Sequence, residues 1–105
     1  SHLIIIYYCH LARPWRPLIT TPWDTRLHGL FATRSPDRPN PLGLCVVELV
    51  ELQGRVLIVR GLDALDGSPV LDIKPYLPTI DAFPGASMGW LEGRMPLGCR
   101  DRGRG

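Results

Sequence analysis

The sequence predicts a mainly β fold, in which short strands form a small twisted sheet and are joined by long proline-rich loops. Eleven prolines and eleven glycines among 105 residues disfavour a helix bundle, because both residue types interrupt helices. Residues 3–9 (LIIIYYC) form a continuous β-branched and aromatic run, and residues 42–52 and 55–61 are apolar runs around a glycine. Such runs are typical of strands. A chain of this length is expected to form one domain.

Composition and charge argue against several classes of protein. A hydrophobic content of 45% with 21% charged residues is typical of a soluble globular protein. The formal net charge of +2 is too small for a domain that binds polyanions with its whole surface. Cys9, Cys45 and Cys99 are widely spaced, which argues against a zinc site and a disulfide framework. No run is long enough to span a bilayer, so we expect no membrane contact and a reducing cytoplasm.

Residues 3–9 are expected to form a central strand that is buried on both faces, because apolar residues occupy both alternating sets. Residues 11–28 are expected to be a loop, since they contain three prolines and no usable periodicity. In this loop Trp15 stands between Arg13 and Arg16. That arrangement suits the stacking of a nucleobase beside phosphate-binding charges. A tryptophan that pins the loop to the core is an equal alternative.

The stretch GLFATRSPDRPNPLGL at residues 29–44 is the most unusual part of the chain. A short strand at residues 30–33 is expected to lead into it. Three prolines then fix φ and lack the N–H that a sheet ladder needs, so the remainder should be a stiff loop. Arg34, Arg38 and Asn40 supply donors suited to a carboxylate, a phosphate or a base edge. The alternative is a proline-stiffened connection with solvated arginines.

Residues 42–52 and 55–61 are expected to pair as a hairpin. They flank Gln53-Gly54, a two-residue connection whose glycine tolerates positive φ. Neither face of the first arm is expected to be purely apolar. On one face, for example, Glu48 lies next to Val46, because residues two apart on a strand point the same way. We therefore expect a twisted and partly exposed hairpin.

A turn and a further strand are expected after the hairpin. Asp66-Gly67-Ser68-Pro69 has the residues of a tight turn. The following VLDIKPY alternates, which predicts a strand with Val70, Asp72 and Lys74 on one face. The two charged residues are either a solvent-facing ion pair that contributes little or a polar strip on the floor of a pocket.

Two blocks make the chain resemble a known family. Residues 29–44 are close to GVFATRSPxRPNPIGLS, and residues 62–78 (LDALDGSPVLDIKPYLP) are close to LDLLDGTPVLDIKPYLP. These are signatures of the tRNA-methyltransferase O family, also called TsaA-like proteins, and they occur here in the family's order. The resemblance extends from about Ser1 to Trp90. It implies a TsaA-like domain at residues 1–98 whose sheet closes into a β-barrel-like structure. The low-complexity residues 99–105 (CRDRGRG) are expected to be a disordered basic tail.

The resemblance implies a methyltransferase that uses S-adenosylmethionine and is unrelated in fold to the Rossmann methyltransferases. Family members methylate N6 of the threonylcarbamoyl-modified adenosine beside the anticodon of tRNA. They are expected to be homodimers with the cofactor pocket at the subunit interface. The cofactor contacts carried over from the family fall on Cys9, His10, Arg34, Leu44, Val70, Leu71, Asp72 and Ile73.

The chemistry of this cofactor is compatible with that set of residues. Apolar side chains can pack around the adenine and the methionine stem, and Arg34 can hold the methionine carboxylate. Methyl transfer from a sulfonium is an in-line displacement that needs alignment and at most one base. Asp72 is the candidate either for that base or for orienting the acceptor nitrogen. Arg38 and Lys74 are candidates for contacts with the RNA.

The chain departs from the family pattern in several places. Cys9 stands where an aromatic residue is usual, Asp37 where an aromatic or apolar residue is common, and Cys45 where serine is typical. Relatives carry further strands ahead of the position of Ser1, including a Pro-Arg-Gln segment that helps to hold the cofactor, and we expect this chain to lack them. Two alternatives follow. One is a non-catalytic S-adenosylmethionine-binding module, and the other is an incomplete or structural member of the family.

Overall fold

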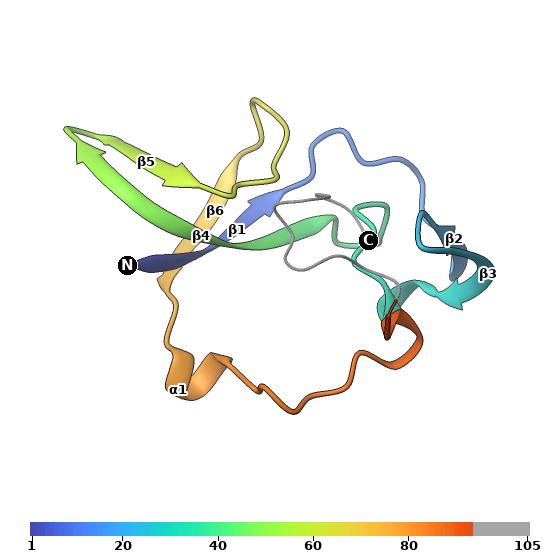
Figure 1. Cartoon of the computed structure of the whole chain (residues 1–105). Coiled ribbons are helices and arrows are strands. Elements are labelled where there is room, and N and C mark those ends of the chain that lie inside the picture. The colour runs from blue at the N-terminus through green and yellow to red at the C-terminus, as the bar shows by residue number, and fades with distance from the viewer. Residues whose placement is uncertain (94–105) are drawn as a thin grey trace.

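The computed structural model describes residues 1–93, which form two antiparallel sheets (Figure 1). The larger sheet has the strand order β5-β4-β1-β6, and the smaller one pairs β2 with β3. The strands are β1 (His2–Tyr8), β2 (Leu18–Thr21), β3 (Asp24–Gly29), β4 (Leu42–Gln53), β5 (Val56–Arg60) and β6 (Val70–Pro75). The helical turns of the described chain are η1 (Leu30–Ala32), α1 (Pro78–Asp81) and η2 (Gly89–Leu91).

The expected closure into a barrel is wrong. β5 and β6 are the two edges of the larger sheet, and within residues 1–93 they do not pair with each other. β2 and β3 lie on the far side of the molecule from β5 and pair only with each other (Figure 1). A barrel requires every strand to be paired on both sides, and four strands are too few to curl into one. The domain is therefore mainly β, as predicted, but its main sheet is open.

β1 is the central strand that the sequence predicts, because it pairs with β4 on one side and with β6 on the other. Ile5 and Tyr7 are buried on one face, where they pack with Cys45 of β4. Ile4 and Ile6 point to the other face and are only half-buried. The expectation of burial on both faces is therefore wrong. This second face of the sheet is partly open to solvent.

β4 and β5 form the predicted hairpin, and Gly54 at its tip has the left-handed φ of 58° that the turn requires. The predicted turn before β6 is also present, with Gly67 at a φ of 85°. β6 itself contains a register shift, so that Asp72 lies opposite Ile6 whereas Val70 lies opposite Tyr7. The shift removes Val70 from the face that it was expected to share with Asp72.

Two of the predictions for residues 11–33 are wrong. The expected loop contains the β2–β3 hairpin, and the expected strand at residues 30–33 is the turn η1. Leu30 explains the second difference: its side chain is buried, and its N–H donates to the carbonyl of Pro17 at 2.8 Å. Thr33 then closes the turn through hydrogen bonds from its N–H and hydroxyl to the Leu30 carbonyl. Short polar strands that pair only locally give little periodicity to read.

The segment after β6 passes through α1 and returns toward η1 (Figure 1). Its return is fixed by Trp90, whose Nε1 donates to the carbonyl of Ala32 at 3.0 Å and whose ring stacks on His28 at a centroid distance of 3.7 Å. The predicted tail at residues 99–105 lies outside the described residues. Within residues 1–93, no helix has the length and apolar character needed to cross a bilayer.

Candidate functional site

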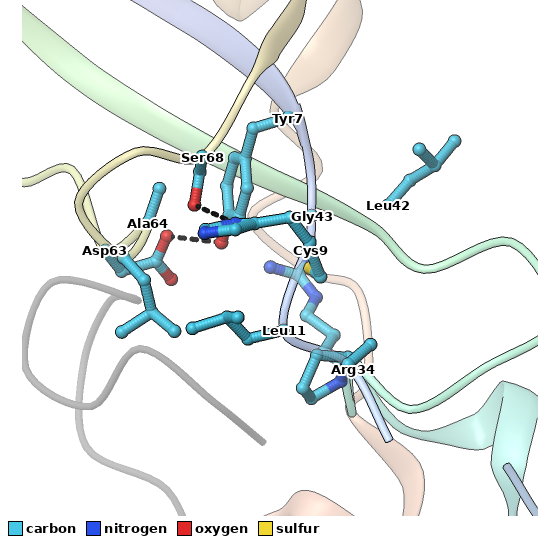
Figure 2. A pocket seen from close by; sticks show the side chains of 13 residues that line it. Tyr7, Cys9, Leu11, Arg34, Leu42, Gly43, Asp63, Ala64 and Ser68 are labelled. Carbon is cyan, nitrogen blue, oxygen red and sulfur yellow. Dashed lines mark hydrogen bonds between the residues drawn. The ribbon is translucent and has the colours of Figure 1, made fainter. Parts of the chain in front are cut away.

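A pocket lies beyond the end of β1, on the side of the sheet that carries the core (Figure 2). Its walls come from three segments, which are residues 7–12, residues 34–43 and residues 63–68. The second of these comes from the loop between η1 and β4 (residues 33–41, hereafter the signature loop) and from the first two residues of β4. The enclosed volume is about 50 Å³. The pocket therefore forms where the two sequence blocks meet the central strand.

Backbone hydrogen bonds bring these three segments together. The N–H of Cys9 donates to the carbonyl of Pro41 at 2.7 Å, which ties the end of β1 to the signature loop. The N–H of Tyr8 donates to the carbonyl of Pro69 at 2.9 Å, which ties the same point to the turn before β6. Both acceptors are proline carbonyls, which remain available for hydrogen bonds although proline has no N–H. The end of β1 is thereby held between the two blocks.

Tyr7 and Asp63 form a polar pair inside the pocket (Figure 2). The Tyr7 hydroxyl donates to Asp63 Oδ1 at 2.8 Å, and the Tyr7 ring is buried. Burial raises the pKa of the Tyr7 phenol well above its usual value, and the hydrogen bond and negative charge of Asp63 raise it further. Tyr7 therefore remains a protonated donor that fixes the Asp63 carboxylate in place.

Arg34 brings a positive charge from the signature loop to the same pocket (Figure 2). Its side chain is exposed, and it makes no hydrogen bond or ion pair with any residue in the described part of the chain. A guanidinium whose donors are not engaged by residues 1–93 is suited to a planar carboxylate or a phosphate. The pocket thus combines an available cation with a carboxylate that is already held.

His10 and Cys9 complete the part of the pocket that the sequence predicted. The Nδ1 atom of His10 lies 3.4 Å from the hydroxyl oxygen of Ser68, at the edge of hydrogen-bonding range. Cys9 is half-buried between β1 and the signature loop. The structure therefore brings Cys9, His10 and Arg34 into one site.

Other predicted cofactor residues lie elsewhere on the sheet. Val70 lines a second hollow of about 320 Å³, which shares Tyr7 and Ser68 with the first. Leu44 and Asp72 lie opposite Ile6 on its two sides, and so belong to the second face of the sheet. The remaining two, Leu71 and Ile73, are exposed and line neither hollow.

Asp72 and Lys74 form an ion pair on β6, with 2.8 Å between Lys74 Nζ and Asp72 Oδ2. Asp72 also accepts a hydrogen bond from the N–H of Ile73 at 2.8 Å. The Lys74 hydrogen bond, followed by that of Ile73, lowers the pKa of Asp72 below its usual value, and the same pair raises the pKa of Lys74. A carboxylate with a low pKa is a weak proton acceptor, although it accepts hydrogen bonds well.

Arg38 does not line the pocket but holds the signature loop in shape. Its guanidinium donates to the carbonyls of Thr33 at 2.9 Å and Ser35 at 3.1 Å. The same group lies over the ring of Phe31, 5.5 Å from the ring centroid. Three groups, the carbonyls of Thr33 and Ser35 and the ring of Phe31, are thereby organised around one side chain. Its predicted contact with RNA remains a prediction.

Sequence reasoning did not single out Tyr7, Gly43 or Asp63 as site residues. Tyr7 was read only as part of an apolar strand, although a tyrosine in a core strand needs a partner for its hydroxyl. Asp63 stands in the second block, ahead of the predicted turn, where a carboxylate interrupts apolar residues. Within residues 1–93, no three His, Cys, Asp or Glu side chains are grouped as a metal site would require.

Comparison with known proteins places this geometry in a family. The family model described as the tRNA-methyltransferase O N-terminal domain matches residues 1–82. The chain belongs to the tRNA-methyltransferase O family. Both sequence blocks and all three walls of the pocket fall within the matched residues.

Curated relatives carry names of two kinds. An Archaeoglobus fulgidus protein named a probable S-adenosyl-L-methionine-binding protein is 56% identical over 96 residues, which are 91% of this chain and 26% of that protein. Another from the same organism, named an S-adenosyl-L-methionine-binding protein, is 48% identical over 90% of this chain and 65% of its own length. The Escherichia coli tRNA (adenine(37)-N6)-methyltransferase is 42% identical in an alignment of 101 positions that covers 88% of this chain and 43% of that enzyme.

Solved structures of the family share the fold. A crystal structure of TrmO superposes with a TM-score of 0.69 at 41% identity, covering 85% of this chain and 38% of that chain. TrmO from Pseudomonas aeruginosa gives a TM-score of 0.69 at 39% identity, covering 86% and 37%. The tRNA-methyltransferase O chain described here thus spans between a quarter and two thirds of the length of the curated relatives above.

Proposed function

We propose that the pocket binds S-adenosylmethionine and that the protein transfers its methyl group to N6 of the threonylcarbamoyl-modified adenosine beside the anticodon of tRNA, in the cytoplasm. The observation that carries the proposal is Arg34, an available guanidinium in a pocket that also holds the Tyr7–Asp63 pair. The names of the relatives support it, since they are S-adenosyl-L-methionine-binding proteins and tRNA (adenine(37)-N6)-methyltransferases.

The polar groups of the pocket match those of the proposed cofactor. The carboxylate of its methionine part suits Arg34, because a guanidinium binds a carboxylate through two parallel hydrogen bonds. The ribose hydroxyls and the methionine ammonium are donors that suit Asp63, whose carboxylate is already oriented by Tyr7. Cys9 and Leu65 supply apolar surface next to these groups. The charged, polar and apolar groups of the pocket therefore fit the cofactor.

The size of the pocket supports a homodimer. About 50 Å³ is enclosed, whereas sites for small molecules usually measure ~300 Å³ or more. The neighbouring hollow of about 320 Å³ adds space. We propose that a second copy encloses the rest, with Leu44 and Asp72 of each subunit presented from the second face of the sheet. Leu44 is exposed there, next to the half-buried Ile6.

When bound, the cofactor would supply an electrophilic methyl group on a sulfonium. Transfer of that methyl group to N6 would break the carbon–sulfur bond and would release one proton from N6 to water or to a basic group. The task of the residues is to align donor and acceptor. We propose that Arg34 and Asp63 hold the cofactor and that Asp72 accepts a hydrogen bond from the N6–H of the adenosine. Its low pKa favours orienting the acceptor over removing the proton.

A non-catalytic S-adenosylmethionine-binding module is the second candidate. The names of the archaeal relatives, which mention binding and no reaction, favour it. It uses the same pocket and predicts the same cofactor affinity. The two candidates differ in one measurement, the transfer of a methyl group to tRNA.

The proposal is tested by calorimetric titration of the full chain with S-adenosylmethionine. We expect saturable binding that Arg34→Ala weakens at least about tenfold, because charge-assisted hydrogen bonds contribute ~1.5–3 kcal/mol. Arg55→Ala is the matched control, since Arg55 is an exposed arginine at the tip of the β4–β5 hairpin. A folded wild-type chain that binds no cofactor would contradict the proposal, and so would equal binding by the Arg34→Ala variant.

Methyl transfer and assembly are tested separately. Radiolabelled methyl groups should appear in tRNA that carries threonylcarbamoyladenosine; cofactor binding without transfer would favour the non-catalytic module. Light scattering should give the mass of a dimer. Leu44→Arg places a charge on the second face of the sheet, so it should yield monomers with weaker cofactor binding. A monomeric wild type would overturn the homodimer proposal alone.

A further inference from the structure

Two exposed aromatic residues lie on adjacent backbone segments beside the pocket. Trp15 is 50% exposed and Phe31 is 76% exposed. The segments that carry them are joined by the hydrogen bond from the N–H of Leu30 to the carbonyl of Pro17. Phe31 directly follows Leu30, and Trp15 precedes Pro17 by two residues. The hydrogen bond thus places the backbone segments that carry the two exposed rings next to each other.

Arginines accompany both rings. Arg16 is adjacent to Trp15 in the chain, is exposed, and makes no hydrogen bond or ion pair with residues 1–93. Arg38 lies over Phe31 at 5.5 Å and donates to two carbonyls of the signature loop. The four residues Trp15, Arg16, Phe31 and Arg38 are called the aromatic–arginine ledge below.

The part of the ledge that carries Trp15 is held on both sides. Before it, Arg13 donates from its N–H to Asp37 Oδ1 at 2.8 Å and pairs through its side chain with Asp37 Oδ2 at 3.3 Å. After it, the carbonyl of Pro17 is bound to Leu30. Proline at positions 14 and 17 also fixes φ. A surface that is already ordered loses little entropy when it binds a partner.

Asp37 does not cancel the positive charge of the ledge. It is the acidic residue in the signature loop, and Arg13 already neutralises it. The guanidinium of Arg16 therefore remains available to an anion. The ledge also adjoins the pocket, because Leu11 and Ala12 of the same loop form part of the pocket wall.

We propose that the aromatic–arginine ledge binds unpaired nucleotides of the RNA next to the adenosine in the pocket. Bases would stack on Trp15 and Phe31, while Arg16 would contact a phosphate. Exposed aromatic rings beside arginines are suited to single-stranded nucleic acid, since every base has a face that can stack. This inference rests on the proposed function and adds to it the surface that selects an unpaired substrate.

The test measures anisotropy of a fluorescein-labelled, unstructured short RNA mixed with the full chain. Trp15→Leu should weaken binding by at least about fivefold, since base–aromatic stacking contributes ~1–3 kcal/mol per base. Trp15→Tyr keeps a ring and should restore most of the affinity. Phe83→Leu is the matched control, because Phe83 is 74% exposed and lies in the segment after α1. It should bind like the wild type.

Arg16→Ala should lower the affinity for RNA. It should also reduce the slope of the logarithm of the binding constant against the logarithm of the salt concentration by about one, because one fewer ion is released on binding. Arg55→Ala at the tip of the distant β4–β5 hairpin should change neither (Figure 1). The same RNA annealed to its complement should bind more weakly than the single strand. Equal affinity for both forms, or an affinity that Trp15→Leu leaves unchanged, would overturn the inference.

Two further readouts separate this inference from the proposed function. Calorimetry should give the same S-adenosylmethionine affinity for Trp15→Leu as for the wild type. Cofactor binding and methyl transfer that survive in Trp15→Leu with unchanged RNA affinity would reject the ledge and leave the proposed function standing. Light scattering in which Trp15→Leu converts a dimer to a monomer would assign the ledge to subunit contact, and would also reject the inference.

Discussion

The ring of Tyr7 lies directly against the backbone of Gly43, its partner across the β1–β4 ladder. A Cβ at position 43 would overlap the Cζ and hydroxyl oxygen of Tyr7. The absence of a side chain at Gly43 thus allows the Tyr7 ring to reach across β4 toward Asp63. One glycine of the first sequence block (residues 29–44) therefore determines where the polar pair of the pocket can form.

Gly43→Ala should destabilise the fold and disturb the pocket. The added methyl group would push the buried Tyr7 ring away from Asp63, and overpacking of this kind costs ~1–3 kcal/mol. Urea denaturation should give that loss, and calorimetry should give weaker cofactor binding. Gly29→Ala is the control, because Gly29 has a negative φ and no heavy atom near a Cβ there. Equal losses in both variants would contradict the role given to Gly43.

Tyr7 should make stability depend on pH in the alkaline range. Its pKa is raised in the folded state by burial and by Asp63, whereas the unfolded phenol titrates near pH ~10. The folded state therefore keeps its proton while the unfolded state loses it. This contribution is complete below pH ~10, and above it the free energy of unfolding falls by up to ~1.4 kcal/mol per pH unit.

Tyr7→Phe should remove the part of the fall in unfolding free energy above pH ~10 that the Tyr7 phenol causes. Urea denaturation at several pH values measures it. The variant should also lose stability at neutral pH, because Asp63 would lack its donor. Tyr8→Phe, at the exposed neighbouring position, serves as the control. A slope that is the same in the wild type and Tyr7→Phe would contradict the assignment.

Arg34 and Arg38 should respond differently to substitution, although both belong to the signature loop. Arg38→Ala removes the donors to Thr33 and Ser35, so we expect a loss of ~1.5–3 kcal/mol in unfolding free energy. Arg34→Ala removes no hydrogen bond or ion pair within the described residues 1–93, so its denaturation curve should match the wild type while cofactor binding is lost. Arg38→Lys should also be less stable than the wild type, because an ammonium lacks the planar guanidinium that lies over Phe31. Full stability in Arg38→Ala would contradict its structural role.

Asp72 should contribute to methyl transfer, but its titration should not produce a bend in the dependence of the transfer rate on pH. Lys74 and the Ile73 N–H lower its pKa below the usual ~3.9, so it stays ionised between about pH 5 and pH 8. Its effect on stability has the matching sign: the contribution is present above pH ~4 and is lost as the pH falls through the folded-state pKa.

Asp72→Asn should slow methyl transfer about tenfold or more through poorer alignment, with cofactor affinity unchanged. Glu48→Gln is the control, because Glu48 is a carboxylate of the same sheet that pairs with Arg60 at 2.7 Å. Turnover of Asp72→Asn at the wild-type rate would exclude any part for this carboxylate. A bend near pH 7 that disappears in Asp72→Asn would instead identify it as a base.

Local chemistry was sufficient to predict the strongest elements. The apolar run of β1, the glycine at the tip of the β4–β5 hairpin and the turn at Gly67 each leave a short-range signal. The mainly β fold and the stiff signature loop followed from them. Cys9, His10 and Arg34, which the resemblance named as cofactor contacts, line one pocket, because the end of β1 meets the two sequence blocks there.

Long-range geometry could not be predicted from the sequence alone. The β2–β3 hairpin is accompanied by long-range contacts such as the hydrogen bond from the Leu30 N–H to the Pro17 carbonyl, and the periodicity of the sequence does not predict such contacts. Closure of the sheet was inferred from the resemblance, and pairing between the edges is absent from the described chain. The register shift that moves Val70 opposite Tyr7 is likewise invisible in the alternation of VLDIKPY. The place of Asp63 in the pocket depends on its hydrogen bond with the Tyr7 hydroxyl, a long-range contact that leaves no local signal in the sequence.

The open sheet also bears on solubility. Each edge strand exposes backbone donors and acceptors that can recruit a strand from another molecule and start aggregation. β5 ends in Arg60, and β6 carries Lys74 followed by Pro75, which has no N–H to offer. Charged side chains and proline are the usual protection of such edges. Replacing Lys74 and Pro75 with apolar β-formers would thus be expected to promote aggregation when the protein is concentrated.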